Sequence, residues 1–225
     1  VWSTDPVNAS HQTEASETVI TYSFSGISGA AGEYVSGYSQ PNPTSDGIFP
    51  FSENHMAATR LALGEFEKIA KLKFVEIEET QDQVGALRFA FTDAENLLDS
   101  GLQAAGWASA PYSNAAAGDV WINSSNMAAN ENWDQGTSTN FGTLLHEIGH
   151  TLGLNHPFDE PYVIPTGFDV SNYTLMSYTD PDSVWWYPYW ADSGSYTLSS
   201  TPMVYDIAAL QYLYGAADYN ETDTV

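Results

Sequence analysis

The twelve residues His146–Pro157, HEIGHTLGLNHP, decide how this chain is organised. On a helix, side chains four residues apart project from one face, so His146 and His150 can bind the same ion. Gly153 can take the left-handed conformation that ends a helix, and the chain can then turn to bring His156 back as a third ligand. Three protein ligands leave one position of a tetrahedral zinc open to water, which is typical of a catalytic site.

Glu147 is rotated by roughly 100° around the helix from its neighbour His146, so we expect it to reach a metal-bound water and not to be a ligand. The short pattern H-E-x-x-H can arise by chance on a polar helix. The longer string H-E-x-x-H-x-x-G-x-x-H is far more demanding, and it is complete here. We therefore predict a zinc ion bound by three histidines, with Glu147 as the general base.

A second motif, YTLMSY, follows at Tyr173–Tyr178. Together the two motifs resemble a metzincin zinc peptidase, in which the extended zinc helix is followed by a Met-containing turn. Three features are more narrowly similar to the serralysins, which are extracellular proteases of bacteria. They are Pro157 directly after the third histidine, the Met-Ser-Tyr order, and the segment PMVYDIAA at Pro202–Ala209. The resemblance extends from about residue 20 to residue 225.

The resemblance implies roles for further residues. Met176 would form an apolar floor beneath the metal, and Tyr178 would be a displaceable zinc ligand that also acts in catalysis. Ordinary packing is the alternative explanation for both side chains. In similar proteins an edge strand lies above the cleft, and an extended peptide can pair with its free backbone groups. An edge strand that binds nothing is the alternative there. The predicted substrate-binding residues are Trp107, Ala108, Ser109 and Ala110.

The expected fold is α+β. The resemblance implies a metzincin-type catalytic domain with a twisted, mostly parallel five-stranded sheet, an antiparallel edge strand, the zinc-binding helix, a Met-turn and a C-terminal helix. Alternation of apolar residues predicts strands at 18–24, 74–78 and 86–91, and two more at 107–110 and 119–123.

Capping residues indicate where the helices begin. Ser52 can cap a helix that runs to about residue 71, with a loop before it at 26–50. Thr139 or Asn140 can cap the zinc helix, which runs to about residue 152. Thr201 and Pro202 can open the last helix, which stops at Gly215.

We expect one metalloprotease catalytic domain over residues 1–225. It divides into a loose N-terminal arm at 1–17, an upper lobe at 18–153 with the sheet and the zinc helix, and a lower lobe at 154–225 with the third histidine, the Met-turn and the C-terminal helix. The aromatic run VWWYPYW at 184–190 can pack on its own domain, line the cleft or bind another domain.

Serralysin-like chains continue into a calcium-binding, glycine-rich repeat domain, and no G-G-x-G-x-D repeat occurs here. We therefore expect a catalytic domain that is detached from that module or was never joined to it. No motif in this chain indicates Ca²⁺, although its acidic loops leave calcium binding open.

The composition limits the partners. Apolar residues make up 43% of the chain and aromatic residues 14%, which is typical of a globular protein. No apolar run is long enough to span a bilayer, so we expect no membrane insertion. There are 5 basic against 29 acidic residues and no cysteine. We expect no nucleic acid partner, because neutralising phosphates requires Lys and Arg.

The predicted function is that of a secreted, extracellular zinc endopeptidase of bacterial type, a monomer that acts on proteins or peptides. One alternative is a zinc-stabilised binding module without turnover, which Glu147 disfavours because a structural site has no use for a base. The other is a matrixin-like metzincin protease, which Pro157 and the Met-Ser-Tyr order disfavour.

Overall fold

A computed structural model describes nine stretches of the chain. They are residues 16–25, 48–80, 83–92, 105–111, 116–124, 133–135, 139–161, 163–179 and 199–218. Most of the predicted N-terminal arm and the whole aromatic run at 184–190 lie outside the described residues. Within these stretches, no helix combines the length and the apolar character that a bilayer crossing requires.

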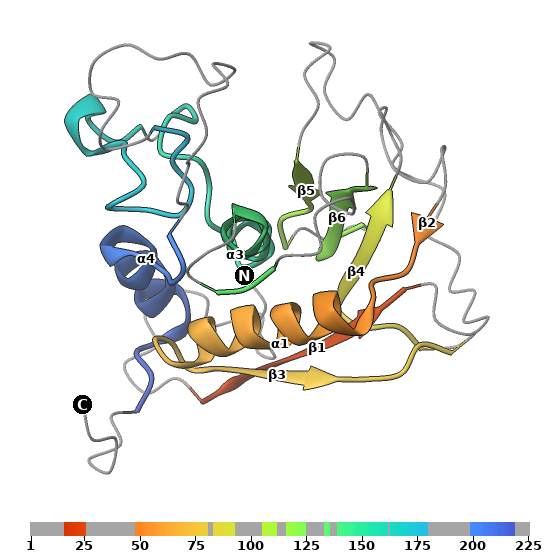
Figure 1. Cartoon of the computed structure of the whole chain (residues 1–225). Helices are drawn as coiled ribbons and strands as arrows, with labels where there is room; N and C mark the ends of the chain where they lie inside the picture. Colours follow the sequence, from red (N-terminus) through yellow and green to blue (C-terminus); the bar gives the residue numbers. More distant parts are fainter. Residues whose placement is uncertain are drawn as a thin grey trace.

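The described strands form one mixed sheet. They are β1 (Thr18–Phe24), β2 (Ile48–Phe49), β3 (Leu72–Glu76), β4 (Leu87–Thr92), β5 (Gly106–Ala108) and β6 (Asp119–Asn123). The order β3-β1-β4-β6 is parallel throughout, and β5 pairs antiparallel with β6 (Figure 1). This confirms the mostly parallel sheet with an antiparallel edge. A sixth strand, the two-residue β2, pairs antiparallel with β4 within residues 26–50, where the sequence predicts a loop.

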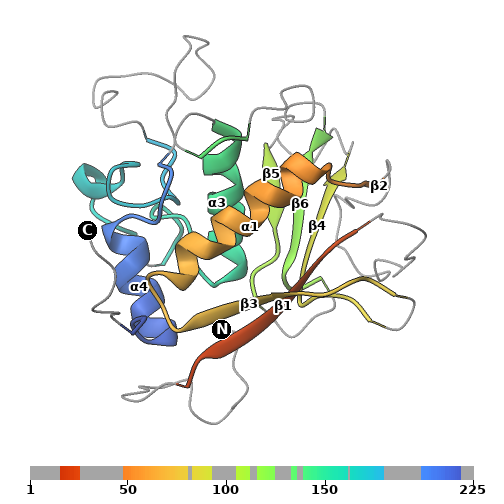
Figure 2. The ribbon, with the colours of Figure 1, turned by 60° about the horizontal axis from the view of Figure 1, so that its bottom comes forward.

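The central strands β4 and β6 are buried along their whole length. Strands that are buried on both faces carry apolar residues at consecutive positions, as at Phe89–Phe91 of β4 and Val120–Ile122 of β6. The helices are α1 (Glu53–Glu67), α3 (Thr139–Thr151) and α4 (Val204–Tyr214). Figure 2 shows α1 crossing in front of the strands, and both views place α3 between β5 and α4.

Helix α1 begins as predicted, because Ser52 and His55 cap it reciprocally through side chain and backbone. One apolar face of the helix is buried and includes Met56, Leu63 and Phe66. The helix ends at Glu67, however, about four residues earlier than expected. The chain turns there so that residues 70 and 71 can pair with residues 216 and 215, which follow α4.

The predicted starts of the other two helices were wrong. Helix α3 already includes Thr139 and Asn140, so neither residue is its cap. Helix α4 begins after Met203, whose backbone N–H donates to Asp206 Oδ2 at 2.8 Å, and Pro202 therefore precedes the helix. Its end at Gly215 was predicted correctly, and this glycine has a positive φ of 85°.

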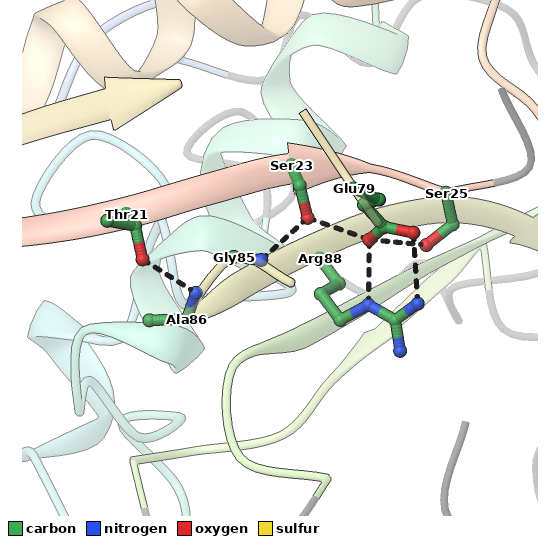
Figure 3. A network of polar contacts seen from close by, with 7 residues as sticks. All are labelled: Thr21, Ser23, Ser25, Glu79, Gly85, Ala86 and Arg88. Atoms are coloured by element: carbon green, nitrogen blue, oxygen red, sulfur yellow. Dashed lines mark hydrogen bonds and ion pairs between the residues drawn. The ribbon is translucent and has the colours of Figure 1, made fainter. Parts of the chain in front are cut away.

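A buried ion pair connects β4 to the segment that follows β3 (Figure 3). Arg88 Nε donates to Glu79 Oε1 at 2.8 Å, and the two side chains are 7% and 1% exposed. The hydroxyls of Ser23 and Ser25 donate to the same oxygen at 2.7 and 3.2 Å, and the Gly85 N–H donates to Ser23 Oγ at 2.9 Å. These hydrogen bonds compensate the carboxylate for the loss of water. The network joins β1 to the segment between β3 and β4, more than 50 residues later in the chain.

We expect Arg88→Ala to lower the free energy of unfolding by about 3–5 kcal/mol, because it leaves the Glu79 charge buried without its cation. Urea denaturation measures the change. The matched control is Lys73→Ala, which removes a half-exposed lysine whose Nζ lies 3.3 Å from Glu67, and which should cost less than about 1 kcal/mol. Equal losses in the two variants would contradict this role for the buried pair.

Candidate active site

Helix α3 carries most of the zinc motif and is anchored by its apolar residues. It packs against α1, β5 and β6. Its fully buried apolar side chains include Phe141, Leu144, Leu145 and Ile148. Because this packing leaves the backbone little freedom to move, the polar residues of the motif project from a rigid element.

The C-terminal end of α3 is a Schellman motif. The N–H of Leu154 donates to the carbonyl of Gly149 and the N–H of Gly153 to that of His150, both at 3.0 Å. Gly153 has a φ of 96°, which confirms the predicted left-handed turn. The same turn brings the carbonyl of Leu154 to 2.9 Å from His150 Nδ1, so the helix end also orients a predicted ligand.

The turn returns His156 to the two helix histidines. One nitrogen from each of His146, His150 and His156 lies within 4.8 Å of the others. The Nε2 atoms of His150 and His156 are 3.1 Å apart. Two nitrogens on a tetrahedral zinc, each ~2.0–2.1 Å from the ion, would be roughly 3.3 Å apart. The predicted ligands therefore come together at a spacing that suits one zinc ion.

Each imidazole uses its Nδ1 atom for a hydrogen bond. His146 Nδ1 lies 2.8 Å from the carbonyl oxygen of Leu175, and His156 Nδ1 lies 3.1 Å from Asp159 Oδ2. Because these oxygens only accept, the Nδ1 atoms carry the protons and the Nε2 atoms present lone pairs to a metal. Asp159 was missed in the sequence analysis, and its only local signal is an acid three residues after the third histidine.

Burial keeps the helix histidines neutral. It lowers the pKa of His146 to about 3, with a smaller contribution from His150, and it lowers the pKa of His150 to about 4. A neutral imidazole is the form that binds a metal. Glu147 is only 5% exposed, and burial raises the pKa of its carboxyl group to about 8.

Met176 packs directly beneath α3. It is 1% exposed, and a Cβ added to Gly149 would lie only 2.9 Å from its sulfur. The thioether therefore fills the space that this glycine leaves on the helix. Met176 therefore contacts α3 at Gly149, next in the chain to the predicted ligand His150.

Asp206 of α4 holds the turn that contains Met176. Its Oδ1 accepts the Thr174 hydroxyl at 2.7 Å, and its Oδ2 accepts the Leu175 N–H at 2.8 Å. The carbonyl of the same Leu175 orients His146, so the last helix is connected to a predicted ligand through one residue. The sequence analysis assigned Asp206 no role.

Tyr178 also lies at the three histidines, as predicted. Its hydroxyl is 2.8 Å from His156 Nε2, and its ring stacks on that of His146 at 5.5 Å. Phe158 lies almost parallel to the ring of His156, with an interplanar angle of 6°. Tyr178 is 50% exposed, so its ring has room to move.

The backbone N–H and C=O groups along β5 point alternately toward β6 and away from it. Asn123 donates to the carbonyl of Ala105 and Ser109 to that of Asp119, both at 3.0 Å. In an antiparallel ladder, residues at alternate positions direct both backbone groups to the same neighbour. The backbone of Trp107, which lies midway and opposite Trp121, therefore faces β6.

It follows that Gly106 and Ala108 direct their N–H and C=O groups away from β6. In the described part of the chain, no strand pairs with that edge of β5. The predicted substrate-binding residues therefore differ in their backbone groups. Those of Ala108 face the open edge, whereas those of Trp107 and Ser109 face the neighbouring strand β6. Ser109 and Ala110 also lie just beyond the strand, which is shorter than predicted. Gly106 was not among the predicted residues.

In chelator, we expect His146 and His150 to lower the stability of the wild type, relative to a double variant His146→Gln with His150→Gln, as the pH falls from 6.5 toward 4. Both side chains remain neutral when folded but protonate near 6.5 when unfolded, so the unfolded state binds more protons at these two residues. The raised pKa of Glu147 acts in the opposite direction, but Glu147 is present in both proteins. Thermal unfolding of the two proteins across this range measures the difference, and a difference that does not change with pH would contradict the assignment.

Comparison with known proteins supports the interpretation of this site as that of a metalloprotease. A family described as matrixin, a peptidase family, matches residues 44–185. Serralysin A from Dickeya chrysanthemi is 32% identical over 80% of this chain and 37% of its own length. A serralysin from Proteus mirabilis is 30% identical over 88% and 40%, and the metalloprotease AprA from Pseudomonas entomophila (strain L48) is 32% identical over 74% and 34%.

The chain spans about a third to two fifths of the length of these relatives. The matched family covers more than half of the chain and includes the zinc motif and the Met-turn. The matrixin-like alternative explains the chain no better than the serralysin interpretation does, since the similar proteins named above are serralysins and a related metalloprotease. The chain therefore belongs to the matrixin peptidase family, as a serralysin-like metzincin catalytic domain.

Proposed function

We propose that this chain is the catalytic part of a zinc-dependent endopeptidase that hydrolyses peptide bonds in proteins. One observation carries the proposal: three imidazoles direct their Nε2 atoms at one point, and the buried carboxyl group of Glu147 comes from the same helix. The similarity to serralysins and to the metalloprotease AprA supports it.

The donor set suits zinc, because three imidazoles with hydrogen-bonded Nδ1 atoms leave a coordination position open. When bound, zinc would polarise the scissile carbonyl and lower the pKa of water to ~7. Glu147 takes the proton of the attacking water and returns it to the leaving amine. Burial raises the pKa of this carboxyl group, whereas the charge of a bound zinc would lower it, so the group would accept the proton as a carboxylate and hold it between the two steps.

Tyr178 is proposed as an additional ligand that moves aside and donates a hydrogen bond to the developing oxyanion. The 2.8 Å separation of its hydroxyl from His156 Nε2 and its half-exposed ring support this role. Asp159, Leu154 and the Met-turn are proposed to orient the ligands, with Met176 as the floor.

A substrate peptide is proposed to pair with the open edge of β5. The outward backbone groups of Gly106 and Ala108 support this mode, while residues 107, 109 and 110 would contact the peptide through their side chains. Secretion to the extracellular medium is proposed from the resemblance to serralysins. The absence of a nucleic acid partner, the monomeric state, calcium binding and the division into lobes at residue 153 stay predictions.

Glu147→Ala should retain zinc and lower kcat for casein or a peptide substrate by at least ~10²–10⁴-fold, because no other group would accept the water's proton. Proteolysis with and without chelator, together with zinc content, tests this. The control is Glu78→Ala, an exposed acid, which should leave kcat unchanged. A zinc-loaded wild type that cleaves no substrate would instead favour a binding module, and substantial cleavage by Glu147→Ala would exclude this role for Glu147.

Tyr178→Phe should keep the ring stacking and the bound zinc but lower kcat by on the order of 10²–10³, the usual loss when an oxyanion donor is removed. KM should change little, since the ring itself remains. Single-turnover kinetics isolates the chemical step. An unaltered kcat would end the proposal for the hydroxyl, and a loss of zinc would show that the hydroxyl is needed mainly as a ligand.

A further inference from the structure

We propose that Gly106 of β5 is a positioning residue, and that its missing side chain makes the space in which the catalytic carboxyl group of Glu147 lies. This inference rests on the proposed function of Glu147 as general base. It concerns a residue that both borders this carboxyl group and offers backbone groups to the open edge of the sheet.

The contact is close. A Cβ built on Gly106 would lie 2.8 Å from both Glu147 Cγ and Glu147 Oε1, and 3.0 Å from Glu147 Cδ. Carbon atoms that are not bonded pack at about 3.5–4.0 Å. A side chain at residue 106 and the present position of this carboxyl group therefore exclude each other.

The backbone conformation does not explain why residue 106 is a glycine. The φ of Gly106 lies outside the left-handed region, in contrast to that of Gly153. Gly106 is paired within an ordinary strand, opposite Ile122. Glycine weakens a strand, and it is often found where another group approaches the backbone closely. The group that approaches here is the carboxyl of Glu147.

Glu147 can avoid an added methyl group only by rotating its side chain. Its helix is held by fully buried neighbours, including Leu144 and Ile148, so the backbone cannot retreat without disturbing the core. Rotation about side-chain bonds is easy for the fold, but it moves the carboxyl oxygen. A misplacement of about 1 Å can cost a reaction on the order of 10²-fold. The added methyl should therefore affect catalysis far more than folding.

Gly106 would also connect substrate docking to the position of the base. Its N–H and C=O groups face the edge at which we propose that the peptide pairs, and its Cα borders Glu147. One residue thereby sets the distance between the bound peptide and the carboxyl group. Gly106→Ala keeps both backbone groups, so peptide binding should persist while the chemical step slows.

The test is Gly106→Ala in the zinc-loaded protein. We expect kcat to fall on the order of 10²-fold, KM to change less than about threefold, and zinc content and Tm to remain at wild-type values. The matched control is Gly64→Ala on α1, where an added Cβ meets nothing within 4 Å, and which should leave kcat unchanged. An unchanged kcat in Gly106→Ala, or a loss of zinc, would overturn the proposal.

The Glu147→Asp variant is a second protein in which to test Gly106→Ala, because it shows whether the loss of kcat comes from the contact with Glu147 or from general damage to the protein. Glu147→Asp withdraws the carboxyl by one methylene, so adding Gly106→Ala to it should lower kcat further by less than about threefold. The same large loss in both backgrounds would overturn the proposal. If Gly106→Ala alone fails to fold, folding of the double variant would support the clash. Failure of both variants to fold would overturn the proposal, because glycine would then be required by the fold.

A crystal structure of zinc-loaded Gly106→Ala provides a readout that is independent of turnover. The Glu147 carboxyl should be rotated away from β5 while the three histidines keep their places, and an unmoved carboxyl would overturn the proposal. If the wild type binds zinc but cleaves no peptide, the proposed function fails, yet this displacement can still be measured. The two failures are therefore distinguishable.

Discussion

The site depends on one requirement: three imidazoles must stay neutral, with their Nε2 atoms aimed at one point. Each ring is oriented by an Nδ1 hydrogen bond to an acceptor from a different segment. The carbonyl oxygen of Leu154, in the turn after α3, accepts from His150. The carbonyl oxygen of Leu175, in the Met-turn, accepts from His146, and the carboxylate of Asp159 accepts from His156. Burial keeps the two helix imidazoles uncharged, and the acceptors determine which nitrogen faces a metal.

Much of the tertiary structure positions those acceptors. The Schellman turn at Gly153 exposes the carbonyl of Leu154, and Asp206 of α4 fixes the peptide unit that presents the carbonyl of Leu175. On the other side of α3, the edge strand β5 contacts Glu147 at Gly106. The zinc helix is thus held between a Met-turn secured by the last helix and a strand whose open edge faces away from β6 (Figure 1).

The sequence predicted features that depend on neighbours within one element. The i,i+4 histidines, the turn at Gly153 and the Ser52 cap follow from helix geometry, and the structure agrees with them. The predictions that failed depended on distant partners. Helix α1 stops early because residue 70 pairs with residue 216, and α4 starts late because Asp206 accepts the Met203 N–H. Strand β2 exists because it pairs with β4.

By itself, the sequence determined which residues could bind a metal and which could act as base, because spacing along a single helix and turn sets their directions. Only the tertiary structure decided which oxygen atoms hold the histidine rings, which backbone groups of β5 face outward, and which glycine leaves room for Glu147. Those contacts join segments far apart in the chain. Their existence depends on how the sheet, α3 and α4 pack together, and no local periodicity encodes that packing.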